Sequence, residues 1–497
     1  MNLMGKFTIG IDIGTTGTKI VLFDVDLGIV GQANREASQF SPQPGYSEAD
    51  PSQWLVNAVD SIREVVASAH ARPEDVIAIA TSGMVPAVIP VDNNGAPLRR
   101  AILQNDARAV EEVGHLTSLL SAVDLVSLTG SALTQQSVAP TAAWLMSHEP
   151  DIWTQTSHLV GSYDWVLMAL GAEPHVERNW ALESGLFTLE SEQLTEVLQA
   201  TGLDSSLLPP VYSPGQRVGT LSAAAAERTG LATGTPLIVG GADHVLSAFA
   251  AGVESEGDCL VKLGGAGDIL VASDRPIVDS RIYLDAHPIP GRWLPNGCMA
   301  TSGSLVRWYQ SVIGGEKLDI LDQEAAGRSA AEVLCLPYFL GEKSPIHDAD
   351  LRGAFVGLHL GHTRADLYRS VLEGIAFGFR HHAEVFREIG IHLDRVIITN
   401  GGSKSTLWKQ IHAEVLGTEL IPIMNHPGAS LGAALVAAVG VGAISDWAEA
   451  KKFLSFGPPV IPEPSRVKTY EAAYNEWREL DLAITPISHS ISRRTRT

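Results

Sequence analysis

The sequence predicts an α/β fold built from two related halves, and two observations lead to this prediction. First, strand-like and helix-like segments alternate along the chain, which is typical of α/β proteins. Second, one pattern occurs twice, in residues 10–23 (GIDIGTTGTKIVLF) and 260–273 (LVKLGGAGDILVAS). Each copy is an apolar strand, a G-x-x-G turn and a second apolar strand. A later pair, 76–83 (VIAIATSG) and 396–402 (VIITNGG), follows in the same order, which indicates an internal duplication.

The first half opens with strands over 7–14 and 19–25, joined by the glycine turn. Residues 52–69 carry apolar side chains at the spacing of one helix face, and Pro51 suits the first turn of that helix. Residues 75–83 are a continuous apolar run that ends in glycine, which indicates a buried strand followed by a turn. The first half is therefore predicted to begin with a hairpin, a helix and a further strand.

The second half contains the same kinds of segment. Residues 235–252, at the junction of the halves, predict a strand, a glycine turn and a helix. A long amphipathic helix is predicted over 367–390, closed by its terminal glycine. Residues 395–403 again predict a strand and a glycine turn. The small side chains of 430–442 predict a helix that can approach its neighbours very closely.

Composition narrows the class of function. The chain has 497 residues, enough for two or more domains, and a net charge of −21. So acidic a surface repels phosphate backbones and anionic lipid, and neither nucleic acid nor a membrane is expected as a partner. The three cysteines are far apart and form no CxxC pattern, which argues against a disulfide framework or a zinc site and fits a cytoplasmic location. No apolar run reaches the ~20 residues of a membrane span, and no signal peptide is expected.

The two glycine hairpins suggest a clamp for phosphate groups. Glycine lets backbone N–H groups approach an anion closely, and Thr15 and Thr16 add hydroxyl donors between Gly14 and Gly17. The alternative is ordinary hairpin chemistry, which also favours glycine. Other phosphate motifs fit less well, because a Walker A loop and a dinucleotide fingerprint both lead into a helix, whereas Lys19 begins a strand.

Two aspartates lie where they could carry the chemistry. Asp12 stands just before the first glycine turn, where it could hold Mg²⁺ next to phosphate groups or could only cap the turn. Asp243 follows a buried strand and a glycine pair and opens an apolar helix. A carboxylate there could accept the proton of a substrate hydroxyl, or it could serve only as an N-cap residue. The residues alone leave both alternatives open.

Nine motifs together resemble the FGGY carbohydrate kinases, and within them the xylulokinase-like members. In chain order they are IGIDIGTTGTK (9–19), ILQNDAR (102–108), VGGADH (239–244), KLGGAG (262–267), LPYFLGEKSP (336–345), RGAFVGL (352–358), VLEGIAFGFR (371–380), TNGGSKSTLWKQ (399–410) and SLGAALVAA (430–438). Most are weak alone, but their order along the whole chain is specific.

The resemblance implies a two-domain actin/hexokinase-like (ribonuclease H-like) fold, with duplicated domains and an interdomain cleft for ATP and sugar. The expected domains are 1–247, which carries the sugar side and the catalytic aspartate, and 248–485, which carries the nucleotide side. Residues 486–497 are expected to form a flexible tail. Homodimers are common in the family, which leaves a homodimer as one expectation here.

The resemblance also implies roles for individual residues. Asp243 matches the catalytic base, and Asp12 together with Asp243 would hold Mg²⁺. The expected nucleotide-binding residues are Gly14, Thr15, Thr16, Gly17, Lys19, Gly264, Gly265, Gly401, Gly402, Ser403 and Lys404. The expected substrate-side residues are Met84, Asn105, Asp106, Arg108, Asp243 and His244. Arg108 could equally pair with a carboxylate, and His244 could be structural.

Departures from the family pattern limit what can be inferred about the sugar. Gly265 stands where many relatives have threonine, so one hydroxyl donor to phosphate is missing. Met84, Val85 and Pro86 stand where pentulose kinases often have Gln-Met-His. The expected reaction is transfer of the ATP γ-phosphoryl group to a hydroxyl of a small sugar, foremost a pentulose such as xylulose. Ribulose, erythritol or glycerol are alternative substrates, and a non-catalytic actin-like ATP-binding protein is the alternative of a different class.

Overall fold

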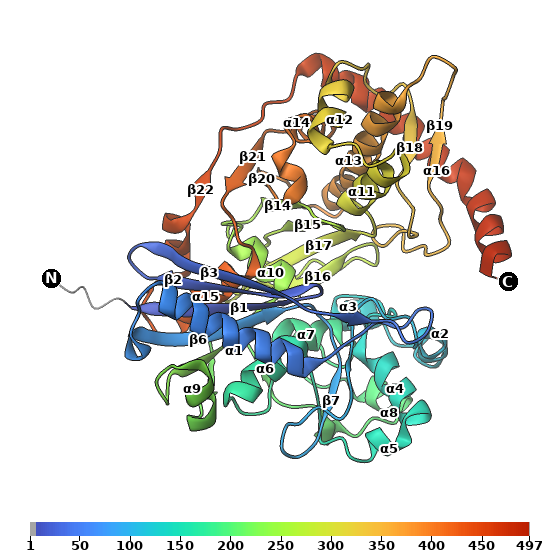
Figure 1. The fold of residues 1–497 in the computed structure, drawn as a ribbon. Helices are drawn as coiled ribbons and strands as arrows, with labels where there is room; N and C mark the ends of the chain where they lie inside the picture. The colour runs from blue at the N-terminus through green and yellow to red at the C-terminus, as the bar shows by residue number, and fades with distance from the viewer. Residues whose placement is uncertain (1–5, 497) are drawn as a thin grey trace.

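The computed structural model describes residues 6–496, which form two α/β domains (Figure 1). The N-terminal half of the chain, blue to green, forms the lower domain in this view, and most of the C-terminal half, yellow to red, forms the upper domain. Each domain is built around one large sheet that carries helices. The predicted α/β class and the two-domain arrangement are confirmed.

Six strands form the sheet of the first domain. Their bounds are β1 Phe7–Gly14, β2 Gly17–Asp24, β3 Gly28–Glu36, β6 Val76–Gly83, β12 Arg217–Thr220 and β13 Pro236–Ala242. The strand order is β12-β13-β6-β1-β2-β3. Strands β1, β2 and β3 form an antiparallel meander, β6 pairs in parallel with β1, and β13 pairs in parallel with β6.

The second domain repeats this topology. Its strands are β14 Asp258–Leu263, β15 Gly267–Val271, β16 Tyr283–Ala286, β17 Trp293–Met299, β20 Arg395–Thr399, β21 Leu420–Met424 and β22 Ser455–Phe456. They lie in the order β16-β17-β15-β14-β20-β21-β22. Strands β14, β15 and β17 are antiparallel, and β20 and β21 add in parallel, as β6 and β13 do in the first domain. The duplication predicted from the glycine hairpins is confirmed.

Shorter strands and the helices complete the two domains. The shorter strands are β4 Gln39–Phe40, β5 Glu48–Ala49, β7 Ile89–Val91, β8 Ala101–Ile102, β9 His158–Val160, β10 Val176–Glu177, β11 Val211–Tyr212, β18 Leu334–Leu336 and β19 Ala354–Val356. The first-domain helices are α1 Pro51–Ser68, α2 Val110–Leu119, α3 Leu125–Thr129, α4 Val138–His148, α5 Pro150–Trp153, α6 Ser162–Leu170, α7 Arg178–Glu183, α8 Thr195–Thr201, α9 Ala223–Thr229 and α10 Asp243–Phe249. The later helices are α11 Gly303–Val312, α12 Leu318–Ala326, α13 Arg364–Glu388, α14 Thr406–Leu416, α15 Ala429–Gly440 and α16 Pro464–Arg496.

Helix α13 begins three residues before the predicted start. Thr363 and Asp366 form a capping box, in which each side chain accepts the backbone N–H of the other residue. The box satisfies two backbone donors that the first turn of a helix otherwise leaves unpaired. A polar first turn precedes the apolar periodicity, which is why the pattern alone placed the start too late.

Helix α15 comes from the C-terminal half of the chain but packs on the first-domain strands β1, β6 and β13. The contact is so close that a Cβ atom at Gly10 would lie 1.9 Å from the carbonyl oxygen of Ser430. On another side of the helix, a Cβ atom at Gly432 would lie 2.3 Å from the carbonyl oxygen of Leu246 in α10. The small-residue helix therefore packs as closely as the sequence predicted, and it ties the two halves of the chain together.

The apolar core follows the same division. One cluster lies around the first sheet and includes Ile9, Ile11 and Ile13, which are fully buried. A second cluster, which includes Phe377 and Trp477, lies around the second sheet. A third joins residues of β2, α10 and α15, such as Val21, Leu246 and Leu435, where the two halves meet.

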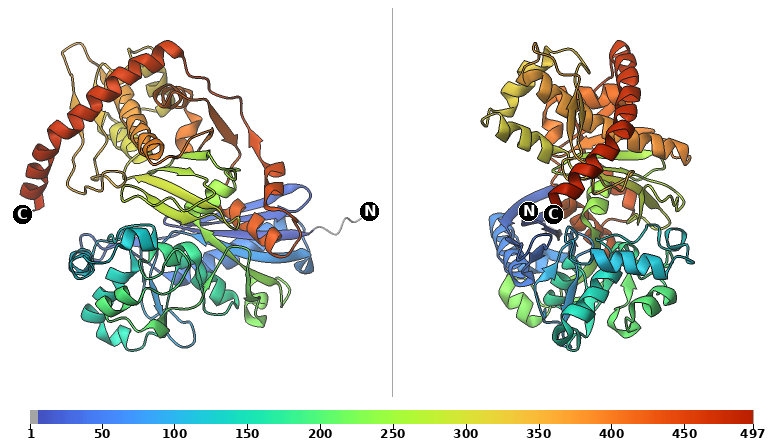
Figure 2. Two further views of the ribbon diagram at one scale, coloured as in Figure 1. Left: turned by 180° about the vertical axis from the view of Figure 1, so that it is seen from behind. Right: turned by 90° about the vertical axis from the view of Figure 1, so that its right-hand side faces the viewer.

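Helix α16 runs through the segment that was expected to form a flexible tail. Residues 486–496 are the last part of this helix, which extends beyond the upper domain in Figure 2. His489 lies 2.6 Å from a carboxylate oxygen of Asp348, and the Ser492 hydroxyl donates to Asp350 at 2.7 Å. These contacts with the loop before β19 hold a segment whose composition alone indicated disorder. In the part of the chain described, no helix has the length and apolarity needed to cross a membrane.

Candidate active site

Two carboxylates of the first domain meet where the domains face each other. Asp12 lies near the end of β1, between Lys19 of β2 and Ser82 of β6 in the sheet register. Asp243 is the first residue of α10, directly after β13. The two carboxylates are close enough for the charge of Asp243 to raise the pKa of Asp12. The fold thus brings together the two acids that the sequence singled out 231 positions apart.

The Asp12 carboxylate lacks the partners that a buried charge needs. The residue is 8% exposed, and its Oδ1 atom accepts no hydrogen bond from the protein. Burial, reinforced by the charge of Asp243, raises the pKa of Asp12 to about 7, against the weaker opposing charges of Lys19 and Lys262. A carboxylate in this state gains from any cation that reaches it.

Asp243 is held in its charged form. Although burial opposes ionisation, the neighbouring His244 and the charge of Lys262 keep the pKa of Asp243 below its usual value. The His244 Nδ1 atom lies 3.4 Å from Asp243 Oδ1, and the Asp243 side chain is 38% exposed. A partly exposed, ionised carboxylate at a helix start can accept a proton from a bound hydroxyl.

His244 also binds an acid from the second domain. Its Nε2 atom lies 2.7 Å from Asp285 Oδ2 and 4.0 Å from Glu183 Oε1. Burial favours the neutral ring, but the carboxylates of Asp285 and Asp243 raise the pKa of His244 well above its usual value. His244 is therefore an imidazolium that links α10 to β16.

Glu183, His244 and Asp285 together have ligand atoms close enough to hold a metal ion. The short contact between His244 Nε2 and Asp285 already uses the nitrogen that would bind such an ion, so we interpret the group as an ion-pair network. Sequence reasoning identified neither Glu183 nor Asp285. Neither stands in a recognisable pattern, because they reach the site only through the packing of α7 and β16 beside α10.

The second glycine hairpin lines a cavity whose size is consistent with a small-molecule site. This cavity, with a volume of about 610 Å³, is lined by Gly264, Gly265, Gly303, Arg307, Gln310, Tyr368, Gly401, Gly402, Lys404 and Trp408. The structure thus brings together five of the predicted nucleotide residues of the second domain. A Cβ atom at Gly402 would lie 2.6 Å from the Leu263 side chain, so this glycine permits the loop after β20 to lie against β14.

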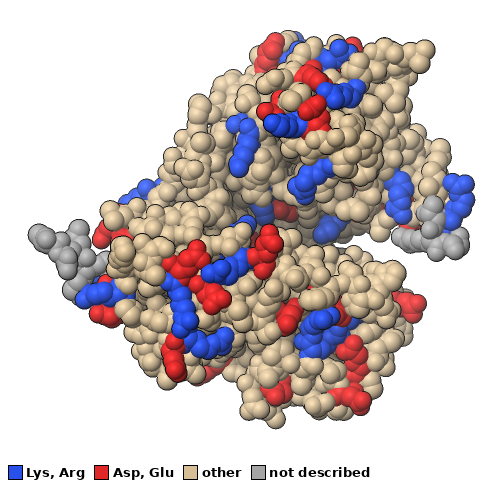
Figure 3. All heavy atoms as spheres, in the orientation of Figure 1, with Lys and Arg blue, Asp and Glu red and all other residues tan. Residues whose placement is uncertain are grey.

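Further predicted nucleotide residues line two neighbouring cavities. Ser403 and Lys404 line one of about 780 Å³, and Lys19 lines one of about 380 Å³. Gln32 and His426 contribute to both, so the two cavities adjoin. In the first hairpin, Gly14 pairs with Gly17 around the turn of Thr15 and Thr16, and Thr16 is exposed. Figure 3 shows the surface hollowed along the line where the two domains meet.

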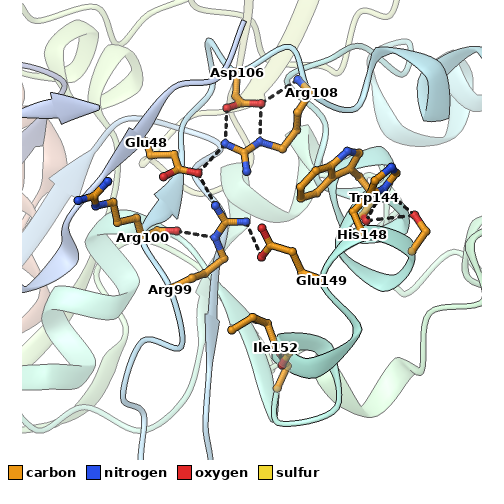
Figure 4. Close-up of polar contacts among 11 residues, drawn as sticks. Glu48, Arg99, Arg100, Asp106, Arg108, Trp144, His148, Glu149 and Ile152 are labelled. Carbon is orange, nitrogen blue, oxygen red and sulfur yellow. Dashed lines mark hydrogen bonds and ion pairs between the residues drawn. The ribbon is translucent and has the colours of Figure 1, made fainter. Parts of the chain in front are cut away.

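The predicted sugar-side residues Asp106 and Arg108 lie in a buried ion-pair network (Figure 4). The Arg108 guanidinium donates to Asp106 and to Glu48, each at 2.8 Å, and its side chain is 1% exposed. It lies over the rings of Tyr46 and Trp144. Asp106 also accepts the backbone N–H of Ser47. Asn105 is exposed on the adjoining turn and Met84 is buried after β6, so the substrate roles of these four residues stay predictions.

The chain matches two domain models along most of its length. Residues 7–250 match the N-terminal domain, and residues 265–441 the C-terminal domain, of the FGGY family of carbohydrate kinases. The chain is 28% identical to the xylulose kinase of Staphylococcus epidermidis over 445 residues, covering 88% of this chain and 89% of that protein. It is 27% identical to the xylulose kinase of Bacillus subtilis, covering 96% of each.

Comparison with solved structures indicates the same family as the comparison with these relatives. The crystal structure of xylulose kinase from Rhodospirillum rubrum is 38% identical, with a TM-score of 0.90, covering 97% of this chain and 100% of that one. The glycerol kinase of Plasmodium falciparum, at 19% identity and a TM-score of 0.87, shares the fold. With both domains matched in order and the duplicated sheets in place, the chain belongs to the FGGY family of carbohydrate kinases.

Proposed function

We propose that the protein transfers the γ-phosphoryl group of ATP to a hydroxyl of a pentulose, with xylulose as the first candidate. The observation that carries the proposal is the position of Asp243, which is ionised, partly exposed and close to Asp12 at the junction of the domains. The nearby cavity lined by Gly264, Gly265 and Gly401 suits a nucleotide. The similarity to proteins described as xylulose kinases supports the choice of sugar.

Asp243 would act as the general base. It would accept the proton of the sugar hydroxyl while that oxygen attacks the γ-phosphorus. His244, an imidazolium held by Asp285, would keep the Asp243 carboxylate oriented. Closure of the domains would exclude water, which otherwise competes with the sugar as the nucleophile.

Mg²⁺ fits the residues that are present. The buried Asp12 Oδ1 atom has no protein partner, and carboxylates with phosphate oxygens are the usual ligands of this ion. Asp12, with Asp243 nearby, would hold the ion, which when bound neutralises the charge of the phosphates. The remaining expectations, a cytoplasmic location and a homodimer, form part of the proposal.

A panel of sugars and polyols tests the proposed function. ADP release in the presence of ATP and Mg²⁺ would be measured with xylulose, ribulose, erythritol and glycerol. The proposal expects the highest kcat/KM with xylulose. A higher kcat/KM with another acceptor would support the proposed kinase activity but identify that acceptor, not xylulose, as the preferred substrate. ATP binding without turnover on any acceptor would instead favour a non-catalytic ATP-binding protein.

A further inference from the structure

Lys262 occupies the position in the second half of the duplicated fold that Asp12 occupies in the first. Both residues stand two positions before the first glycine of the hairpin turn, Asp12-Ile13-Gly14 in β1 and Lys262-Leu263-Gly264 in β14. Their strands are topologically equivalent, because each lies between the partner strand of its hairpin and the first parallel strand. The duplication has therefore placed an acidic residue and a basic residue at matching positions on the two sides of the cleft.

The cross-strand partners show the same reversal of charge. Asp12 lies opposite Lys19 in the first hairpin, and Lys262 lies opposite Asp268 in the second. The Lys262 Nζ atom lies 3.1 Å from Asp268 Oδ2, and the Lys262 side chain is 14% exposed. Burial opposes the charge of Lys262, but Asp268 and Asp243 raise its pKa above the usual value, so the ammonium keeps its proton.

The ammonium acts across the domain boundary. Leu263 and Gly264, which directly follow Lys262, line the cavity at the second hairpin, and the Lys262 charge is within electrostatic reach of Asp12 and Asp243, the two first-domain acids of the site. An ion pair that served only to fix the β14–β15 hairpin would need Asp268 alone. Lys262 therefore lies where a cation can meet whatever anion enters between Asp12 and Asp243.

The residues of the adjoining turn carry no side chain of their own that could bind phosphate. Gly265 has no hydroxyl, and a Cβ atom there would lie 3.3 Å from a guanidinium nitrogen of Arg307. The backbone N–H groups of the turn remain, but a phosphoryl group in transfer carries charge on three equatorial oxygens. A preorganised cation two residues before the turn can supply the missing donor.

We propose that Lys262 binds the γ-phosphate of ATP and stabilises its charge during transfer, as a catalytic residue that compensates for the hydroxyl donor absent at Gly265. This inference rests on the proposed function. In the reaction, a bond forms between the sugar oxygen and the γ-phosphorus, and the bond from that phosphorus to the β–γ bridging oxygen breaks. The hydroxyl proton passes to Asp243. Lys262 exchanges Asp268 for a phosphate oxygen and keeps its own protons throughout.

Lys262→Met tests the proposal, with binding and turnover measured separately. Calorimetry in the presence of Mg²⁺ gives the Kd for ADP and for β,γ-imido-ATP, which retains the third phosphate. The variant should weaken binding of the triphosphate analogue about tenfold or more, since a charged hydrogen bond is lost, and leave the Kd for ADP within about twofold. With the best acceptor, kcat should fall by about 10²–10³-fold. Lys262→Arg should recover part of both losses.

Two further variants separate this role from a structural one. Asp268→Asn removes the ion-pair partner but leaves Lys262, so turnover should stay within about fivefold of the parent. Lys343→Met removes a neighbouring positive charge of the second domain, and the ratio of the two dissociation constants should not change. The proposal would be overturned if Lys262→Met weakened the binding of ADP and of the analogue equally. It would also be overturned if Lys262→Met and Asp268→Asn lost activity and melting temperature to the same extent. If the parent phosphorylated no acceptor, the proposed function would fail, and the two dissociation constants would still decide the role of Lys262.

Discussion

The buried carboxyl group of Glu342 makes the stability of the second domain depend on pH. Glu342 is 6% exposed, and its Oε1 atom accepts the backbone N–H groups of Ala300 at 2.7 Å and Lys343 at 2.8 Å. Burial raises the pKa of Glu342 from 4.5 to about 8 in the folded protein, although these hydrogen bonds favour the charged form. Between these two values the folded chain holds a proton that the unfolded chain releases.

The sign and size of the effect follow from proton linkage. Because the folded state binds more protons between pH 4.5 and about 8, the free energy of unfolding falls as pH rises through this window. One group contributes up to about 1.4 kcal/mol per pH unit, so the loss between pH 5.5 and pH 8 is up to about 3 kcal/mol. Glu342→Gln keeps an Oε1 acceptor for both N–H groups but has no proton to release.

We therefore expect the stability of Glu342→Gln relative to the parent to increase by up to about 3 kcal/mol between pH 5.5 and pH 8. The assay is urea unfolding, followed by tryptophan fluorescence, at pH 5.5, 6.5, 7.2 and 8. Glu190→Gln, at an exposed position, is the control for the substitution itself. Parallel stability curves for Glu342→Gln and the parent would refute the reasoning, since the group would then ionise without cost in the folded state.

Three further predictions test the site and the packing. Asp243→Asn should retain nucleotide binding and lower kcat by about 10²–10⁴-fold in the coupled ADP assay, and near-normal turnover would exclude Asp243 as the base. Arg108→Met should destabilise the protein by about 3–5 kcal/mol in urea unfolding, because the buried Asp106 loses its ion-pair partner and Glu48 keeps only Arg99, and a rise in sugar KM at unchanged stability would instead indicate a substrate contact. Gly432→Ala should cost about 1–3 kcal/mol or more, because its Cβ atom would meet the Leu246 carbonyl, whereas Gly114→Ala has open space within a helix and should cost nothing.

The sequence was most informative where local patterns carry the structure. The range 7–14 was predicted from its apolar pattern and its terminal glycine, and β1 has these bounds. The position of Asp243 between a buried strand and an apolar helix was likewise readable, but the predicted glycine turn is wrong, because β13 continues through Gly240 and Gly241 to Ala242 and α10 begins at Asp243. In both cases the order of residues along the chain was enough to predict where the element lies.

What the sequence did not reveal depends on segments that meet only in the folded chain. Glu48 precedes Arg108 by 60 positions, and no pattern joins them, so both readings of Arg108 stayed open. Glu183 and Asp285 reach His244 through the packing of α7 and β16. Small side chains predicted that α15 packs closely, but not that its partner is the sheet of the other half. Such pairings are set by tertiary packing, to which local periodicity is blind.

The duplicated fold also explains why, in the proposed reaction, only one half supplies the general base. Strand β13 leads directly into Asp243 at the start of α10, whereas the equivalent strand β21 leads through Gly428 into α15. The same asymmetry separates Asp12 from Lys262. A triphosphate held between two acidic hairpins would meet repulsion from both, and one held between two basic hairpins would leave no ligand for a metal ion. In the proposed reaction, an acidic residue and a basic residue at matching positions would let the first domain hold the cation and the second hold the anion, so that closing the cleft would bring both to the same phosphate.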